Sequence, residues 1–240
     1  MKIVAAAGLG AKALVHSGIH DLSALGLSYA AIFGALLIAL ALKRAGVQQH
    51  SIRKIVHIGA GVWIIPTVRL FDSWVWAIIP ALTFIPMNYF FDRLTRTARS
   101  ARGMDAGLIF FPISYCLLLA ICWGNEERNL RYIAVAGIMA MTWGDSMAAV
   151  IGKRWASHSY RTRSYIRTWE GTSAMFVFSV VSIALTLLWM GRLTWSATWP
   201  VAIAAGFAAA TAEAISPSGT DNLTVPLCTA AVIYGLTAMR

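Results

Sequence analysis

Four acidic residues of this chain stand at places where a carboxylate needs a physical reason. Asp145 interrupts an apolar run in TWGDSMAAVIGKRW, Glu170 opens another run in RTWEGTSAMF, and Glu213 and Asp221 bracket EAISPSGTD. A carboxylate within an apolar helix costs a few kcal/mol unless it faces a cavity, a cation or a partner. Carboxylates also bind Mg²⁺, position hydroxyl groups and accept protons. These four acids are therefore the candidate catalytic residues.

The residues around Asp145 are small, and Gly144, Ala148 and Gly152 recur at every fourth position. One interpretation is a tight helix-packing seam, in which Asp145 hydrogen-bonds to a neighbouring helix. The other is an opening through which a bulky polar ligand approaches Asp145. We favour the second interpretation, because the other three acids fall on the same side of the predicted membrane domain.

Basic residues accompany the acids, and Arg and Lys bind phosphate oxygens well. In RKIVHIGAG, Arg53 and His57 share a helical face, although membrane anchors with an interfacial His would look the same. No second His or Cys has metal-ligand spacing to His57. Acids that hold a metal and cations that hold phosphates are the parts of a phosphoryl-transfer site. The chain has no P-loop and no Rossmann glycine pattern, so the membrane domain itself would bind a nucleotide.

Two helix starts carry further candidates. Thr168 and Gly171 flank Glu170 at a predicted helix N-terminus, where unpaired N–H groups suit a phosphate. An ordinary capped helix start explains the same residues. Asn222 follows Asp221 and is a candidate metal or phosphate ligand, although either residue is also a good helix N-cap.

The elements that position these residues are long apolar runs. The chain is 58% hydrophobic and only 12% charged, whereas about a quarter of a soluble domain is charged. A membrane span takes about 20 apolar residues, and about eight runs approach that length. The sequence predicts an all-α, polytopic integral membrane protein without a soluble domain, with spans near 22–42, 55–71, 74–91, 107–123, 132–152, 171–190, 198–215 and 223–239.

Charge and length predict the orientation and the domain division. The loops 43–54, 92–106 and 153–170 hold thirteen of the 20 Lys and Arg residues, which places them in the cytoplasm together with the acids. The net charge of +10 indicates loops that face anionic lipids, not a nucleic-acid partner. We expect an N-terminal interfacial segment over 1–21 and one membrane-embedded catalytic domain over 22–240, in a bacterial inner membrane.

Four sequence elements follow one another between residues 50 and 240: RKIVH, GDSMAAVIG, IRTWEGT, and Glu213 followed by DNLTVPL. Together they resemble the polyprenol kinase family, CTP-dependent lipid kinases that include dolichol and phytol kinases. The similarity is greatest to the phytol kinase branch. Two positions depart from the family pattern: Ala156 stands where dolichol kinases have Gly, and Ile166 stands in place of a basic residue. The matching positions are Arg53, Lys54 and His57; Gly144, Asp145, Ala148 and Gly152; Arg167, Thr168, Glu170, Gly171 and Thr172; and Glu213, Asp221, Asn222, Val225, Pro226 and Leu227.

The resemblance implies Mg²⁺-dependent transfer of the CTP γ-phosphate to phytol, farnesol, geranylgeraniol or a longer polyprenol. Asp145 and Asp221 would bind Mg²⁺ or position the hydroxyl, with Glu170 and Glu213 in support. The sequence does not decide which acid is the base. The nucleotide-binding residues would be Arg53, Lys54, His57, Gly152, Lys153, Arg163, Arg167, Thr168, Gly171 and Asn222.

Three alternatives remain open at the sequence level. A CTP-dependent phosphatidate cytidylyltransferase would need the same Mg²⁺ and CTP apparatus, and a diacylglycerol kinase would differ only in the acceptor. An ion-coupled transporter also carries intramembrane acids beside small residues. The sequence leaves open which alcohol is the acceptor and whether the chain forms a homodimer.

Overall fold

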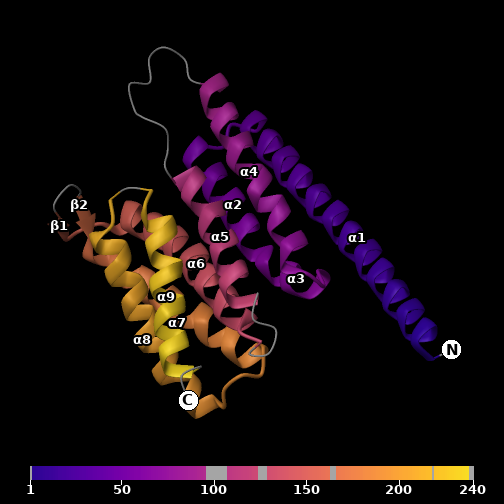
Figure 1. The fold of residues 1–240 in the computed structure, drawn as a ribbon. Helices are drawn as coiled ribbons and strands as arrows, with labels where there is room; N and C mark the ends of the chain where they lie inside the picture. Colours follow the sequence, from indigo (N-terminus) through magenta and orange to yellow (C-terminus); the bar gives the residue numbers. More distant parts are fainter. Residues whose placement is uncertain (1, 96–106, 124–128, 163–165, 218, 238–240) are drawn as a thin grey trace.

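The computed structural model describes residues 2–95, 107–123, 129–162, 166–217 and 219–237. Helices run up and down in a bundle, with one small β-hairpin at one end (Figure 1). The elements are α1 (Lys2–Arg44), α2 (Gln49–Val62), α3 (Ile64–Leu70), α4 (Trp74–Thr95), α5 (Gly107–Trp123), α6 (Arg131–Trp155), β1 (Ser159–Arg161), β2 (Ile166–Thr168), α7 (Trp169–Trp189), α8 (Trp195–Ile215) and α9 (Asp221–Thr237).

The centre of the bundle is α6. It packs on α7, α9, α2 and α5, and α7 in turn packs on α8 and α8 on α9. Apolar and small residues of its first four turns are fully buried, among them Ile133, Val135, Ile138 and Met141. A helix that is apolar on all sides belongs inside a bundle. Asp145 therefore lies on the helix that is the most buried of the four candidate spans within the described residues.

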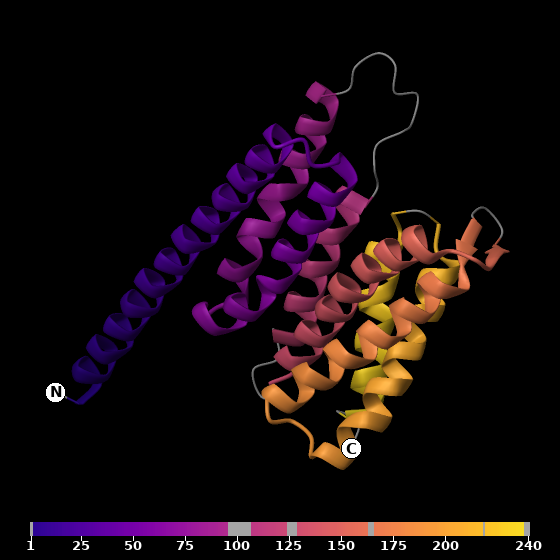
Figure 2. The same cartoon turned by 180° about the vertical axis from the view of Figure 1, so that it is seen from behind.

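We call the end of the bundle that carries β1 and β2 the hairpin end. There α6 ends, α7 begins, and the turn from α8 leads into α9 (Figures 1 and 2). Gly219 in that turn has φ +87°, a conformation that residues with a side chain rarely adopt. The sequence places the four candidate acids at this end, and the topology brings their elements together there.

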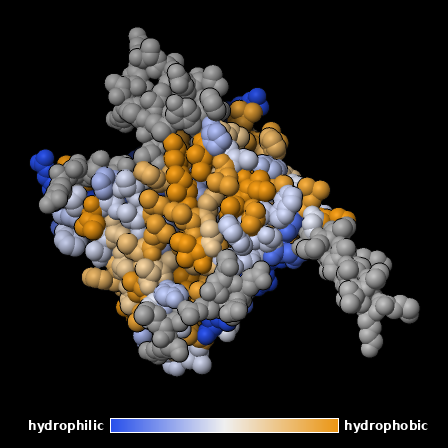
Figure 3. All heavy atoms as spheres, viewed as in Figure 1, coloured by the Kyte–Doolittle hydropathy of each residue, from blue (hydrophilic) through white to orange (hydrophobic). Residues whose placement is uncertain are grey.

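The all-α prediction is confirmed for the fold as a whole, and each predicted span has a helical counterpart. By length and composition, four helices of the described chain are able to cross a membrane: Gly18–Arg44, Arg131–Trp155, Trp169–Trp189 and Trp195–Ile215. Hydrophobic residues cover the middle of the face seen in Figure 3, and most strongly hydrophilic residues lie near its margins. A total of eight spans without a soluble domain stays a prediction.

Two local features differ from the sequence prediction. The span 55–71 is divided at Trp63 into α2 and α3, because Pro66 lacks the N–H that would continue the helical ladder. The loop predicted over 153–170 contains an antiparallel hairpin, in which Tyr160 pairs with Arg167. Both features depend on a few residues in a short stretch. A prediction of spans from the mean hydropathy of a long apolar run does not detect them.

The N-terminal helix α1 lies along the edge of the bundle, against α2, α3 and α4 (Figures 1 and 2). Its backbone is continuous from Lys2 to Arg44, across the boundary that the sequence places at residue 22. Buried Asp21 fastens it to the turn between α3 and α4 by accepting the backbone N–H of Asp72 at 2.7 Å. The interfacial placement of residues 1–21 stays a prediction.

Candidate active site

Asp145 faces α2, where it pairs with Lys54 and lies near His57. The Lys54 ammonium donates to Asp145 Oδ2 at 2.6 Å and lies 3.4 Å from the Asp145 carbonyl oxygen. The His57 Nε2 atom lies 3.7 Å from the same carboxylate oxygen. Lys54 and His57 are three residues apart and therefore share a helical face. The sequence grouped His57 with Arg53 instead, but Arg53 is exposed, because the packing of α2 on α6 sets the rotation of α2.

A second group forms around Arg167, on strand β2. Its guanidinium forms an ion pair with Glu213 of α8 and lies 3.6 Å from Asp221 Oδ2 of α9. It also donates to the backbone carbonyl of Glu213 at 3.1 Å. Glu213 is only 4% exposed, and Arg167 supplies the charge that a buried carboxylate requires. The hairpin thus holds Arg167 over the junction of α8 and α9.

The two groups form one electrostatic unit, which we call the acid cluster: Lys54, His57, Asp145, Arg167, Glu213 and Asp221. The Asp145 carboxylate is attracted by Arg167, and Glu213 and Asp221 both interact with Asp145 and Lys54. Three carboxylates therefore lie near two basic side chains, Lys54 and Arg167. The surplus of negative charge and the carboxylate oxygens of Asp145, Glu213 and Asp221 are of the kind that a hard divalent cation such as Mg²⁺ prefers.

Buried polar atoms without a hydrogen-bond partner concentrate at this place. Over the described residues they include His57 Nε2 and Arg167 Nε in the acid cluster, and Ser146 Oγ beside Asp145. A buried donor that lacks a partner costs about 1–3 kcal/mol, so such atoms usually serve a ligand, a water or an ion. The acid cluster therefore has unused hydrogen-bonding capacity for a polar ligand.

Asn222 and Phe111 frame the acid cluster on the side of α5. The Asn222 amide donates to the Gly107 carbonyl at 3.1 Å and ties the start of α9 to the start of α5. The Phe111 ring lies 4.9 Å from the His57 ring, between centroids. Phe111 was missed at the sequence level, since an aromatic residue in an apolar run carries no distinguishing signal.

Glu170 has no contact with the acid cluster among the described residues. Its carboxylate accepts the backbone N–H groups of Ser157 and His158 at 3.2 and 3.1 Å, and its Oε1 lies 2.9 Å from His158 Nδ1. These bonds fasten the segment before β1 to the start of α7. The structure therefore gives Glu170 a role in positioning the hairpin, and its catalytic role stays a prediction.

The small residues near Asp145 pack against α7. A Cβ atom on Gly144 would lie 2.6 Å from Met175 Sδ, and one on Gly152 would lie 2.9 Å from Thr168 Oγ1. The Thr168 hydroxyl in turn caps α7 by accepting the Gly171 N–H at 3.1 Å. The packing seam therefore accounts for the glycines at 144 and 152. Nucleotide binding by Gly152, Thr168 and Gly171 stays a prediction.

Further cations surround the hairpin end. Lys153 is exposed in the last turn of α6, and Arg154 stacks on Trp155 with its guanidinium carbon 5.4 Å from the ring centroid. Partial burial and the positive charges of Lys54 and Lys153 lower the pKa of His50 below its ordinary value. This rim therefore owes its positive charge to Lys and Arg. Arg163 lies outside the described residues.

Comparisons with known proteins identify the family. The chain is 33% identical to a phytol kinase of Synechocystis over 218 residues, which are 88% of this chain and 90% of the relative. This chain belongs to the phytol kinase family. Plant relatives are more distant: a probable chloroplastic phytol kinase of Triticum aestivum is 26% identical over 82% of this chain and 71% of its own length. A probable phytol kinase 1 of Glycine max is 28% identical over 95% and 79%.

No family model matches the chain, and no solved structure matches it. Membership of the phytol kinase family confirms the resemblance found in the sequence. In the part of the chain that the structure describes, charged side chains with little exposure gather in the acid cluster, which makes it the candidate active site of this family member.

Proposed function

We propose that this chain is a membrane-embedded kinase that transfers the γ-phosphate of CTP to the hydroxyl of an isoprenoid alcohol, such as phytol, at the cytoplasmic face of a membrane. The relatives that share its family are named phytol kinases. The observation that carries the proposal is the acid cluster. Half-buried Asp145 lies against Lys54 and His57, near an arginine that pairs with two further acids.

The proposed roles follow from the charges and their neighbours. Lys54 and Arg167 now pair with carboxylates and would turn to phosphate oxygens when a triphosphate enters. Glu213 and Asp221 would bind Mg²⁺, which neutralises phosphate charge when it is present. Lys153, Arg53 and Arg163 would attract the nucleotide at the rim.

Asp145 would meet the acceptor. Its carboxylate would accept a hydrogen bond from the alcohol and take up its proton as the oxygen attacks the γ-phosphorus. A new O–P bond forms, the bond between the γ-phosphorus and the β–γ bridging oxygen breaks, and CDP leaves. The product is the isoprenoid monophosphate.

The decisive experiment incubates purified protein with Mg²⁺, γ-labelled CTP and phytol, geranylgeraniol or diacylglycerol. We expect label on the isoprenoid alcohols, with CDP as the second product. A CDP-lipid with release of pyrophosphate would instead support a cytidylyltransferase, and transfer to diacylglycerol alone would overturn the choice of acceptor.

Asp145→Asn tests the assignment of the acid cluster within this assay. We expect an activity loss of about 100-fold or more, because the amide neither takes up the proton nor balances Lys54. Glu170→Gln is the matched acid-to-amide change outside the acid cluster, and its loss should be much smaller. Thermal unfolding in detergent checks that both variants are folded, and full activity of folded Asp145→Asn would contradict the assignment.

A further inference from the structure

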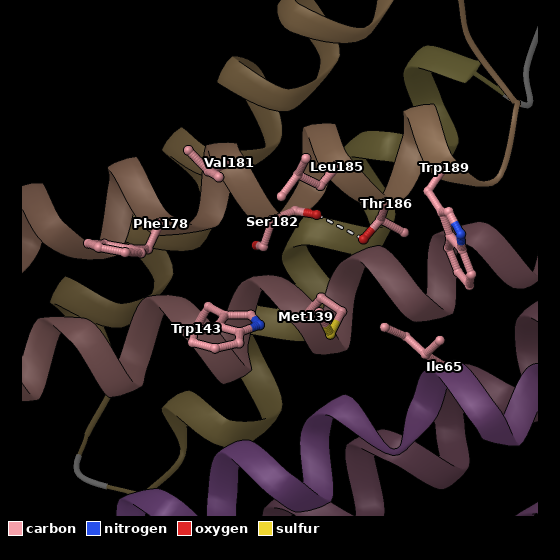
Figure 4. A pocket seen from close by; sticks show the side chains of 9 residues that line it. All are labelled: Ile65, Met139, Trp143, Phe178, Val181, Ser182, Leu185, Thr186 and Trp189. Carbon is pink, nitrogen blue, oxygen red and sulfur yellow. Dashed lines mark hydrogen bonds between the residues drawn. The ribbon is translucent and has the colours of Figure 1, made fainter.

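An elongated apolar groove runs along α6 and α7 on the side where α3 approaches them (Figure 4). Ile65 of α3, Met139 and Trp143 of α6, and residues of α7 from Phe178 to Trp189 line it. Its volume is about 460 Å³, within the range of roughly 300–1,000 Å³ that is typical of small-molecule sites. A lipid chain of limited length would fit such a groove.

The walls of the groove are mostly apolar, so a ligand would meet mainly hydrocarbon groups. The polar side chains on its α7 wall are Ser182 and Thr186, and both donate to backbone carbonyls of α7, at 3.0 and 2.8 Å. Leu185 is 63% exposed, so the groove is open along its side. An apolar, laterally open groove receives hydrocarbon from the bilayer directly, without passage through water.

Trp189 lines the end of the groove away from the hairpin. The Arg69 guanidinium of α3 stacks on the Trp189 ring of α7, with its carbon 4.2 Å from the ring centroid. This pair bridges the two walls. From Phe178 to Trp189 the groove follows eleven residue-to-residue steps of helix α7, about 16 Å. That length is about half of the ~30 Å hydrocarbon core of a bilayer.

The other end leads toward the acid cluster. Met139, Trp143 and Ser146 follow one another at i, i+4 and i+7, and so form one stripe along α6. At about 100° per residue, Ser146 lies between Trp143 and Asp145 around the helix. Ser146 is 1% exposed, and its hydroxyl has no hydrogen-bond partner within the described chain. A buried, unpaired hydroxyl thus lies between an apolar groove and a reactive carboxylate.

We propose that this groove binds the hydrocarbon chain of the acceptor alcohol, that Ser146 hydrogen-bonds to the alcohol hydroxyl beside Asp145, and that the Arg69–Trp189 stack limits the length of chain accepted. The inference rests on the proposed function and makes it more specific. The groove takes an isoprenoid of the size of geranylgeraniol or phytol, whose chain fits one leaflet. It excludes polyprenols that are several times longer.

Two opposite substitutions test the groove with the purified protein. Leu185→Trp fills the middle of the groove and should shift the preference, as a ratio of kcat/KM, from geranylgeraniol toward farnesol by about tenfold or more. Trp189→Ala removes the far wall and should raise the relative use of solanesol. Ile203→Trp is the control: it enlarges a side chain of α8 that is 50% exposed and does not line the groove. It should leave the chain-length profile unchanged.

The outcomes separate this inference from the proposed function. Failure of the wild type to phosphorylate any alcohol would refute the proposed function. An active wild type whose Leu185→Trp and Trp189→Ala variants keep the original chain-length profile would refute the groove. Trp189→Ala widens the groove, so the test does not depend on the folding of the overfilled variant.

A binding experiment tests the groove without turnover. Geranylgeraniol that carries a diazirine should label peptides of α6 and α7 that contain Trp143 and Leu185, and Leu185→Trp should reduce the labelling. Unlabelled geranylgeraniol should compete. Equal competition by phosphatidylglycerol would overturn the proposal and assign the groove to a membrane phospholipid. Ser146→Ala should raise KM for the alcohol more than it lowers kcat, and an unchanged KM would remove Ser146 from the acceptor site.

Discussion

At the scale of single residues, the acids of the acid cluster lie against cations that other elements supply. Lys54 of α2 neutralises Asp145 of α6, and Arg167 of β2 neutralises Glu213 of α8. A buried ion pair is weak evidence for stability, since desolvation offsets much of the attraction. Such pairs are more readily explained by what their charges do when a ligand enters. Lys and Arg that exchange carboxylate for phosphate would open the carboxylates to Mg²⁺.

Arg167→Ala is expected to lower stability as well as activity. It leaves Glu213 buried without its cation, which costs about 3–5 kcal/mol when one partner of a buried pair is removed. Thermal unfolding in detergent measures the loss. Arg161→Ala changes an exposed arginine of the neighbouring strand and should be close to neutral.

The double variant Arg167→Met with Glu213→Gln separates the two effects. It removes both charges, so we expect stability to recover in large part while activity stays low. Recovery of activity along with stability would show that Arg167 acts only as a structural partner of Glu213.

The acids were predictable from the sequence, because a carboxylate within an apolar run costs free energy and therefore indicates a partner or a function. The basic residues that pair with these acids were harder to predict. Lys54 lies next to Arg53 in the chain, and only the docking of α2 on α6 selects Lys54 for Asp145. Ser146 was likewise hidden among the small residues, since a serine in a membrane helix usually bonds to its own backbone.

At the scale of elements, α6 has two faces with different tasks. Asp145 points to α2, whereas Gly144 lies against Met175 and Ser179 of α7. The small-residue stripe read from the sequence is thus real, but it serves the approach of α7. Helix positions were predictable because apolar runs are long. The hairpin was not, since its pairing of Tyr160 with Arg167 joins three-residue strands that carry no periodic signal.

Gly144→Ala tests this packing seam. Its new methyl group would meet Met175 Sδ at 2.6 Å, and overpacking of this kind costs about 1–3 kcal/mol. Gly235→Ala on α9 is the matched control, because nothing lies within 4 Å of the added carbon. That control should be neutral or stabilising by up to about 1 kcal/mol, the difference in helix propensity. Equal unfolding temperatures of the two variants would contradict the seam.

At the scale of the whole molecule, the two proposed substrates approach from different phases. The acid cluster lies at the hairpin end, where α6 ends with exposed Lys153 and where the proposed water-soluble nucleotide would arrive. The apolar groove extends from there along α6 and α7, where the proposed isoprenoid chain would arrive from the bilayer. Helices form most of both sites. A helix pairs its own backbone N–H and C=O groups in hydrogen bonds within the lipid and still presents side chains at every depth of the membrane.

This division requires the hairpin end to face the compartment that contains the nucleotide. The basic loops predict that this compartment is the cytoplasm. Ser159 of β1 and Ser196 of α8 are exposed serines at opposite ends of the bundle (Figure 1). We expect a cysteine at 159, in a chain without Cys116, Cys122 and Cys228, to react with an impermeant maleimide in inside-out vesicles only. A cysteine at 196 should react in intact cells or right-side-out vesicles only. Reversed labelling would place the acid cluster outside and remove its access to cytoplasmic CTP, whereas labelling of both cysteines from one side would contradict the spanning topology itself.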